Sequence, residues 1–205
     1  MNQSRKIIPA IRKVSTRLPT KHGKFKINLY DSLDNKEHVA LVMGDVCKKK
    51  KVWVRVHSEC MTGDVFGSMR CDCGEQLAKS MQMVGEKGEG IIIYMRQEGR
   101  GIGLAEKLAA YNLQDKGMDT VDANLELGHQ NDMRDYSYAA AIIAELEADS
   151  ICLITNNPNK IDALRSLGVV IDERIPLVPT INPENINYIR TKAQRMHHYF
   201  DLPEE

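Results

Sequence analysis

Two different spacings of apolar residues divide the chain into an early and a late part. In the early part apolar and polar residues alternate, which is the spacing of strands that bury one face. This alternation predicts three strands, which we expect to be antiparallel pieces, at residues 23–30, 38–43 and 52–57. The residues before them, 1 to about 21, are basic, and we expect them to form a weakly structured lead-in.

The later part combines short apolar runs with helical spacing. The runs fit buried strands at residues 90–94, 150–154 and 169–171. Helical spacing, in places stopped by glycine, predicts helices at residues 74–87, 102–116, 136–147, 160–167 and 187–200. Strand, loop and helix in repeated order indicate βαβ crossovers. We therefore predict a single α/β domain with a mixed sheet, antiparallel in its N-terminal strands and built of βαβ units in the C-terminal half.

Composition and charge add little to this fold prediction. Apolar residues make up 42% and charged residues 27% of the chain, as in ordinary globular proteins. Lys and Arg total 28, and so do Asp and Glu, so we expect neither nucleic acid nor membrane as a partner. Two local basic runs, residues 1–26 and 48–51, are interpreted as a mobile tail and a hairpin tip. No run approaches the ~20 apolar residues of a membrane span, and we expect a cytoplasmic protein.

The most specific chemistry lies in a window of three cysteines, Cys60, Cys71 and Cys73, spaced C-x10-C-x-C. Thiolates suit zinc, and a catalytic zinc site keeps three protein ligands with one open position, whereas a structural site takes four. No other cysteine lies in the window. His57, three residues before Cys60, is a possible fourth ligand. A chance cluster of unrelated thiols is the simpler alternative.

Three polar loops supply further candidate chemistry. Residues 96–103 contain glycines that permit close backbone approach and arginines that can clamp phosphate oxygens. Residues 155–160 fit either an anion site at a helix N-terminus or ordinary helix capping. Residues 124–135 hold a carboxylate and a guanidinium two residues apart, which is equally compatible with a surface turn. Together with an open zinc site, these loops indicate hydrolysis of a phosphorylated substrate.

Five segments of the chain, taken in order, closely resemble the GTP cyclohydrolase II family: residues 55–60, 71–74, 96–100, 132–134 and 155–160. The resemblance runs from about residue 15 to about residue 198. It implies a basic N-terminal extension at 1–14 and a catalytic domain at 15–200. It also implies the family's reaction at the first step of riboflavin biosynthesis. That reaction is zinc-dependent hydrolysis of GTP to formate, pyrophosphate and a 2,5-diamino-6-(phosphoribosylamino)pyrimidinone.

The resemblance assigns roles to individual residues. Cys60, Cys71 and Cys73 would hold one Zn²⁺ per subunit, and Mg²⁺ would enter with GTP. The positions that contact GTP in the family are matched by Arg55, Val56, His57, Ser58, Glu59, Gln76, Glu98, Gly99, Arg100, Thr120, Thr155 and Lys160. Members of the family are usually homodimers, so a homodimer is expected.

Three further residues match catalytic positions of the family. Asp132 matches a proton acceptor, Arg134 an arginine assigned as the nucleophile toward the α-phosphate, and Tyr111 an active-site tyrosine. A protonated arginine is a poor nucleophile, because its pKa exceeds ~12. Stabilisation of transition-state charge would explain the same residue.

Two alternative functions are considered. The first is a related enzyme that opens the ring but retains the formyl group. The second is a zinc-stabilised nucleic-acid-binding module that uses the basic tail and the lysine run; it predicts a closed four-ligand zinc site and salt-dependent binding. This second alternative leaves Asp132, Arg134 and the phosphate-binding loops unexplained.

Overall fold

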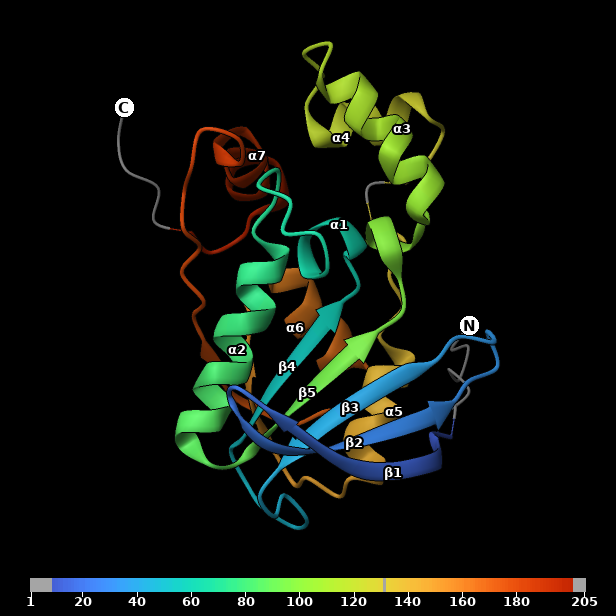
Figure 1. The fold of residues 1–205 in the computed structure, drawn as a ribbon. Helices are drawn as coiled ribbons and strands as arrows, with labels where there is room; N and C mark the ends of the chain where they lie inside the picture. Colours follow the sequence, from blue (N-terminus) through green and yellow to red (C-terminus); the bar gives the residue numbers. More distant parts are fainter. Residues whose placement is uncertain (1–8, 131, 201–205) are drawn as a thin grey trace.

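In the part of the chain that the computed structural model describes, residues 9–130 and 132–200, seven strands form one open mixed sheet (Figure 1). The strands are β1 (Ile11–Thr20), β2 (Gly23–Asp31), β3 (His38–Met43), β4 (Val52–Ser58), β5 (Gly90–Met95), β6 (Ile151–Ile154) and β7 (Ile171–Ile175). They lie side by side in the order β1-β2-β3-β5-β4-β6-β7. Pairs from β1 to β5 are antiparallel, and pairs from β5 to β7 are parallel. The predicted fold class is confirmed.

The helices follow signals that the sequence carries locally. They are α1 (Met61–Asp64), α2 (Cys73–Lys87), the 3-10 turn η1 (Glu98–Gly101), α3 (Leu104–Gln114), α4 (Thr120–Glu126), α5 (Ser137–Glu145), α6 (Pro158–Ser166) and α7 (Ile186–Met196). The side chain of Asn157 accepts a hydrogen bond from the backbone N–H of Asn159 and so begins α6, with Pro158 at its first turn. Gly88, at φ 75°, ends α2.

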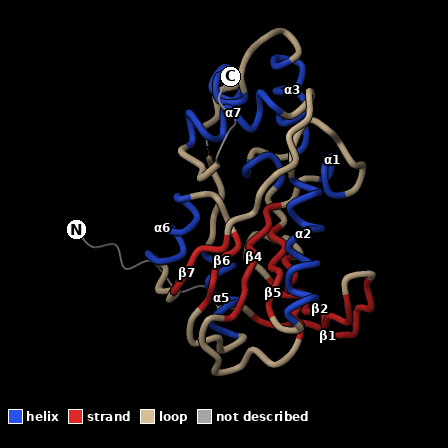
Figure 2. Tube along the Cα trace, turned by 90° about the vertical axis from the view of Figure 1, so that its left-hand side faces the viewer, coloured by secondary structure: helices blue, strands red, loops and turns tan. Residues whose placement is uncertain are grey.

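Helices cover both faces of the sheet, as the two perpendicular views show (Figures 1 and 2). On one face α2 packs Val84 against a cluster that includes Phe25 and Ile92. On the other face α5 and α6 bury Ile142 and Leu164 in the larger apolar cluster. Close packing of helices on both faces fixes the central parallel strands in position. The loops that follow these strands therefore begin at well-defined places.

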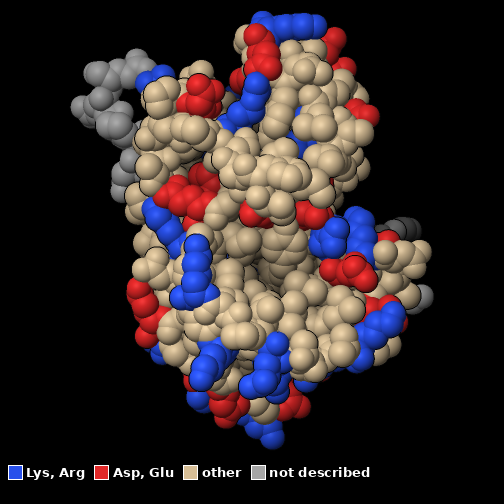
Figure 3. All heavy atoms as spheres, in the orientation of Figure 1, with Lys and Arg blue, Asp and Glu red and all other residues tan. Residues whose placement is uncertain are grey.

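The remaining helices, α1, α3, α4 and α7, lie beyond the carboxyl ends of β4 and β5 (Figure 1). Ligands of open α/β sheets bind at this end of the strands. The space-filling view shows basic and acidic side chains interspersed over one face of the molecule (Figure 3). None of the helices in the described part has the length and apolar content needed to cross a bilayer.

The expectation of a weakly structured lead-in is wrong for residues 11–20. They form β1, which pairs with β2 from Ile11 opposite Asp31 to Thr20 opposite Gly23. Most side chains of β1 are exposed, because it is the edge strand, and so it lacks the apolar alternation of a half-buried strand. The expected domain boundary at residue 14 falls inside β1, and residues 1–8 of the expected extension lie outside the described residues.

The predicted hairpin between the strands at 38–43 and 52–57 is also wrong. These strands, β3 and β4, are separated in the sheet by β5. The lysine run between them is therefore not a hairpin tip but part of a crossover tied to the loop after α5. Lys48 N–H donates to Glu147 O at 2.7 Å, and Asp149 N–H donates to Lys49 O at 2.9 Å.

Three other boundaries differ from the predictions. The strand expected at 169–171 is β7 at Ile171–Ile175, an edge strand whose Asp, Glu and Arg side chains hide the strand pattern. Part of the loop expected at 124–135 is α4, which begins where Asp119 accepts from Val121 N and Asp122 N. The helix expected to reach residue 200 ends at Met196, because His197 adopts a left-handed conformation at φ 54°.

Candidate active site

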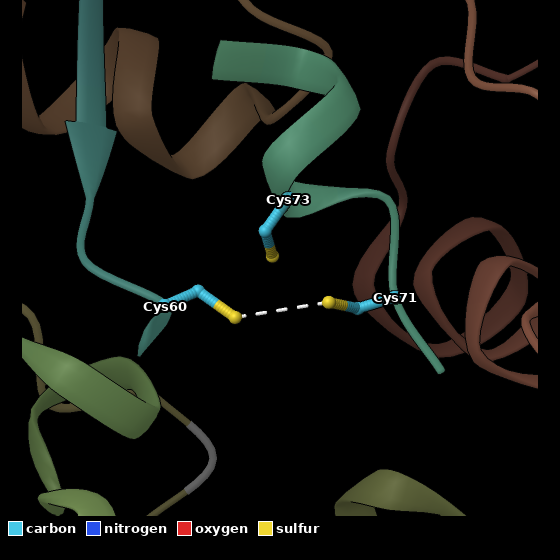
Figure 4. A group of neighbouring side chains, drawn as sticks. All are labelled: Cys60, Cys71 and Cys73. Carbon is cyan, nitrogen blue, oxygen red and sulfur yellow. Dashed lines mark hydrogen bonds between the residues drawn. The ribbon is translucent and has the colours of Figure 1, made fainter. Parts of the chain in front are cut away.

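The three cysteines of the C-x10-C-x-C window converge on one point (Figure 4). Their sulfur atoms all lie within 4.8 Å of one another, and Cys60 Sγ is 3.7 Å from Cys71 Sγ. Cys60 follows β4, Cys71 lies in the loop before α2, and Cys73 is the first residue of α2. This grouping comes from two separate elements, so the alternative of unrelated thiols is not supported.

Two glycines allow the thiols to approach. A Cβ at Gly63 would lie 3.0 Å from Cys71 Sγ and 3.2 Å from Cys60 Sγ, so the space beside the sulfur atoms is kept open. A Cβ at Gly74 would lie 2.2 Å from Gly63 O, which is closer than any real contact. The missing side chains therefore let α2 sit directly against α1, and this contact sets the position of Cys73.

Gly74→Ala is expected to lower zinc affinity and melting temperature, because α2 must move away from α1 and take Cys73 with it. Overpacking of this kind costs ~1–3 kcal/mol. Competition with a chromogenic zinc chelator and thermal unfolding measure the two effects. Gly67→Ala is the control: its Cβ meets no atom within 4 Å, so it adds only the ~1 kcal/mol of a left-handed backbone. Equal zinc affinity in both variants would contradict this account.

Asp64 holds the cysteine loop in place from within. Its carboxylate accepts hydrogen bonds from Cys60 N–H at 3.0 Å, Tyr94 O–H at 2.9 Å and His57 Nε2 at 3.0 Å. Burial lowers the pKa of His57, so its imidazole is neutral and donates from Nε2. Among the described residues the possible metal group contains only the three cysteines, so His57 as a fourth ligand is not supported.

Lys107 of α3 links the thiols to the glycine-rich loop. Its Nζ donates to Cys60 Sγ at 3.0 Å and to Glu98 Oε1 at 2.7 Å. The other oxygen of Glu98 accepts from Met61 N–H at 2.6 Å. Hydrogen bonds from Cys71 and Cys73, and then from Lys107, lower the pKa of Cys60 despite its burial. The site therefore favours the thiolate at Cys60, which is the form that binds metal, while their hydrogen bonds to Cys60 raise the pKa values of Cys71 and Cys73.

The pocket beside the thiols is strongly cationic. Seven Lys or Arg side chains and two Glu side chains line it. The cations come from seven different elements or loops of the fold and are Arg55, Arg70, Arg100, Lys107, Arg134, Lys160 and Lys192. Four of these cations pair with a carboxylate, but the cations outnumber those partners, so a ligand with several negative charges would relieve the remaining repulsion.

Lys160 is the most deeply placed of these cations. It is 4% exposed, and its Nζ donates to the backbone carbonyl of Val56 at 2.6 Å. Burial, followed by the charges of Arg55 and Arg134, holds the pKa of Lys160 well below its usual range. Asn157 caps α6 and also lines the pocket, so capping and pocket formation coexist in the 155–160 loop.

Asp132 and Arg134 form an ion pair at the pocket wall. Arg134 Nε donates to Asp132 Oδ1 at 2.8 Å, and Arg134 Nη2 donates to Oδ2. Gly101 brings the glycine-rich loop to this pair, since its Cβ would lie only 2.9 Å from Met133 O. Burial opposes ionisation of Asp132, but hydrogen bonds and charge from Arg134 outweigh burial and lower the carboxyl pKa.

Comparison with known proteins agrees with this arrangement. A family model described as GTP cyclohydrolase II matches residues 11–176, which is most of the chain. The chain belongs to the GTP cyclohydrolase II family. The five segments that carried the resemblance all fall within the matched residues.

Curated relatives are similar over nearly the whole chain. "Riboflavin biosynthesis protein RibBA" of Chlamydia trachomatis serovar D is 52% identical over 92% of this chain and 45% of its own length. The protein of the same name from Mycobacteroides abscessus is 54% identical over 91% of this chain and 46% of its own. The chain thus spans about half the length of the curated relatives it matches. Among solved structures, a two-domain 3,4-dihydroxy-2-butanone 4-phosphate synthase from A. baumannii aligns with TM-score 0.47 and 19% identity, over 82% of this chain and 40% of that chain.

The residues matched to functional positions of GTP cyclohydrolase II all line the pocket except Val56 and Asp132. The Val56 side chain is buried in the core, and only its carbonyl faces Lys160. Asp132 pairs with Arg134, which does line the pocket. Tyr111 lies beside the thiols, where its hydroxyl is 3.2 Å from Thr62 Oγ1.

Sequence reasoning missed several residues of the site. The sequence could have identified Lys107, because it lies four residues before Tyr111 on α3 and therefore on the same face of the helix. Asp64, Lys192 and His198 had no such signal, because only the folded chain brings Asp64 to the cysteine loop and the other two to the pocket. Lys192 Nζ donates to the buried carboxylate of Asp72 at 2.5 Å, across 120 residues of sequence.

Proposed function

We propose that this chain hydrolyses GTP to a 2,5-diamino-6-(phosphoribosylamino)pyrimidinone, formate and pyrophosphate, as the first step of riboflavin biosynthesis. The observation that carries the proposal is that three grouped thiols and seven Lys or Arg side chains line one pocket. The thiols fit a metal that activates water, and the cations fit a triphosphate.

Cys60, Cys71 and Cys73 fit zinc by donor chemistry and by space. All three donors are sulfur, and the absent side chain of Gly63 leaves room beside them. Zinc held by three protein ligands lowers the pKa of bound water to ~7 and so supplies a nucleophile at neutral pH. Lys107 supports the site by stabilising the Cys60 thiolate.

Gln76 is suited to bind the guanine base. Its Nε2 donates to Asp72 Oδ2 at 2.5 Å, and its Oε1 accepts from Arg55 Nη2. Because an arginine only donates and an ionised carboxylate only accepts, these two partners fix which way the amide faces. One N–H and one oxygen lone pair of Gln76 remain for guanine O6 and N1–H.

The cations of the pocket would bind the triphosphate. Mg²⁺ would enter with GTP, since this ion usually takes most of its ligands from phosphates and water. Arg134 acts here as a stabiliser of phosphate charge. For nucleophilic attack it would have to lose a proton to a group such as Asp132. Their ordinary pKa values differ by more than ~8 units, or ~11 kcal/mol, and their pairing widens the gap.

Purified protein incubated with GTP and Mg²⁺ is expected to release formate and pyrophosphate in equal amounts, and only when zinc is present. Parallel reactions with and without a zinc chelator, followed by quantification of both products, test this. Pyrophosphate without formate would favour the related enzyme that retains the formyl group. Neither product from a folded, zinc-loaded sample would refute the proposed reaction.

The nucleic-acid-binding alternative receives less support. It requires a closed four-ligand zinc site, whereas the group found in the described residues has three donors. The homodimer, the cytoplasmic location and the magnesium ion stay predictions. Light scattering of the eluting protein during gel filtration would measure its oligomeric state.

A further inference from the structure

The chain turns back toward the pocket immediately after α7. His197 takes a left-handed conformation at φ 54°, which ends α7 at Met196. Two backbone hydrogen bonds then fix the reversed segment: His198 N–H donates to Lys192 O at 3.0 Å, and Tyr199 N–H donates to Asn156 O at 2.9 Å. Asn156 belongs to the loop after β6, so the segment is anchored to the sheet as well as to α7. This turn places the His198 side chain on the pocket wall.

The His198 ring carries a nitrogen that lacks a partner. Its Nε2 is enclosed by protein, and it makes no hydrogen bond with the described residues. An enclosed polar nitrogen without a partner costs free energy, so its persistence in a pocket needs an explanation. The ring also packs against Phe200 in a tilted arrangement, at 5.6 Å between centroids.

The charged groups that act most strongly on His198 are cations. They come from four elements or loops and are Lys192 of α7, Arg134, Arg100 of η1 and Lys160 of α6. Lys and Arg side chains have only hydrogen-bond donors. None of these donors reaches Nε2, so in the tautomer that carries its proton there, Nε2–H needs an acceptor, and the surrounding positive charge favours an anionic one.

We propose that His198 binds the polyphosphate of the substrate, with Nε2–H donating to a phosphate oxygen. This inference rests on the proposed function and extends it, because the five segments that resemble the family all end before α7. In this proposal the turn after α7 forms one wall of the phosphate site.

Electrostatics supports this placement. Burial, and then the four cations, lower the pKa of His198 to about 2, so the ring is neutral while the pocket holds no anion. A bound polyphosphate brings the opposite charge and so raises the pKa again. The ring then donates more strongly to the phosphate, because charge-assisted hydrogen bonds are the stronger ones.

The test measures binding of inorganic tripolyphosphate and of guanosine to the zinc-loaded full chain by calorimetry. His198→Ala is expected to weaken tripolyphosphate binding by about 10- to 100-fold and to leave guanosine binding unchanged. His198→Gln places an amide N–H near the position of Nε2 and is expected to recover most of the loss. His197→Gly is the matched control, since it removes the neighbouring imidazole and glycine tolerates the left-handed backbone.

Tripolyphosphate affinity within twofold of the parent in His198→Ala would overturn the proposal. An equal loss for guanosine and tripolyphosphate would also overturn it, because that pattern indicates general damage to the pocket. The proposed reaction and the role of His198 are tested by different measurements. If the parent protein releases no formate from GTP, the proposed reaction is refuted. The binding of tripolyphosphate still decides whether His198 contacts phosphate.

Discussion

Cys71→Ser is expected to abolish zinc binding and formate release while the protein stays folded. Removing one of three thiolates leaves two protein ligands, too few for a stable zinc site. Loss of an activated water costs several kcal/mol of transition-state stabilisation, so turnover should fall by on the order of 1,000-fold or more. The fold should survive, because Cys71 lies in a loop outside both apolar clusters. Metal analysis, circular dichroism and formate release measure the three effects.

Cys47→Ser provides the matched control for this prediction. Cys47 is an exposed cysteine, and its Sγ contacts Glu147 rather than the thiol group. This variant should keep one zinc per chain and full turnover. A metal-free Cys71→Ser protein with parental activity would refute the zinc-dependent reaction.

Asp132→Asn is expected to reduce turnover by about 100- to 10,000-fold, the usual contribution of a general acid–base group. Zinc content should not change, because Asp132 does not belong to the thiol group. GTP affinity should stay equal or increase, since the change removes a negative charge from beside a cationic pocket. Single-turnover kinetics and equilibrium binding of GTP separate these effects.

Asp135→Asn is the control for Asp132→Asn, three residues further along the same loop. Asp135 is exposed and accepts hydrogen bonds from the backbone N–H and hydroxyl of Ser137, which an asparagine oxygen can also accept. It should retain normal turnover. Similar losses in both variants would show that loop charge, rather than the position of Asp132, controls the reaction.

Sequence reasoning succeeded where chemistry is concentrated in short segments. The thiol site could be predicted because its ligands span only residues 60–73 and no other residue type offers soft sulfur anions. The glycine-rich and 155–160 loops could be placed because each follows an apolar strand. Strand neighbours were harder, because alternation identifies strands but does not say that β5 inserts between β3 and β4.

Contacts between distant residues could not be predicted at all. Asp64 resembles any acidic residue of a polar loop until the fold brings Tyr94 and His57 to its carboxylate. Lys192 and His198 lie on a charged helix and the turn after it, where polar side chains normally face solvent. Their burial is decided by tertiary packing, which a local pattern does not encode.

The position of α7 after all seven strands in sequence has a consequence for synthesis on the ribosome. Strands β1 to β7 and the thiol loop all precede Ile186 in sequence, and domains tend to fold from the N-terminus as they emerge. The sheet and the three thiols can therefore assemble before α7 leaves the exit tunnel. Zinc is then expected to load onto the nascent chain first, and the ability to hold a nucleotide is expected to arrive only with α7 and the turn after it.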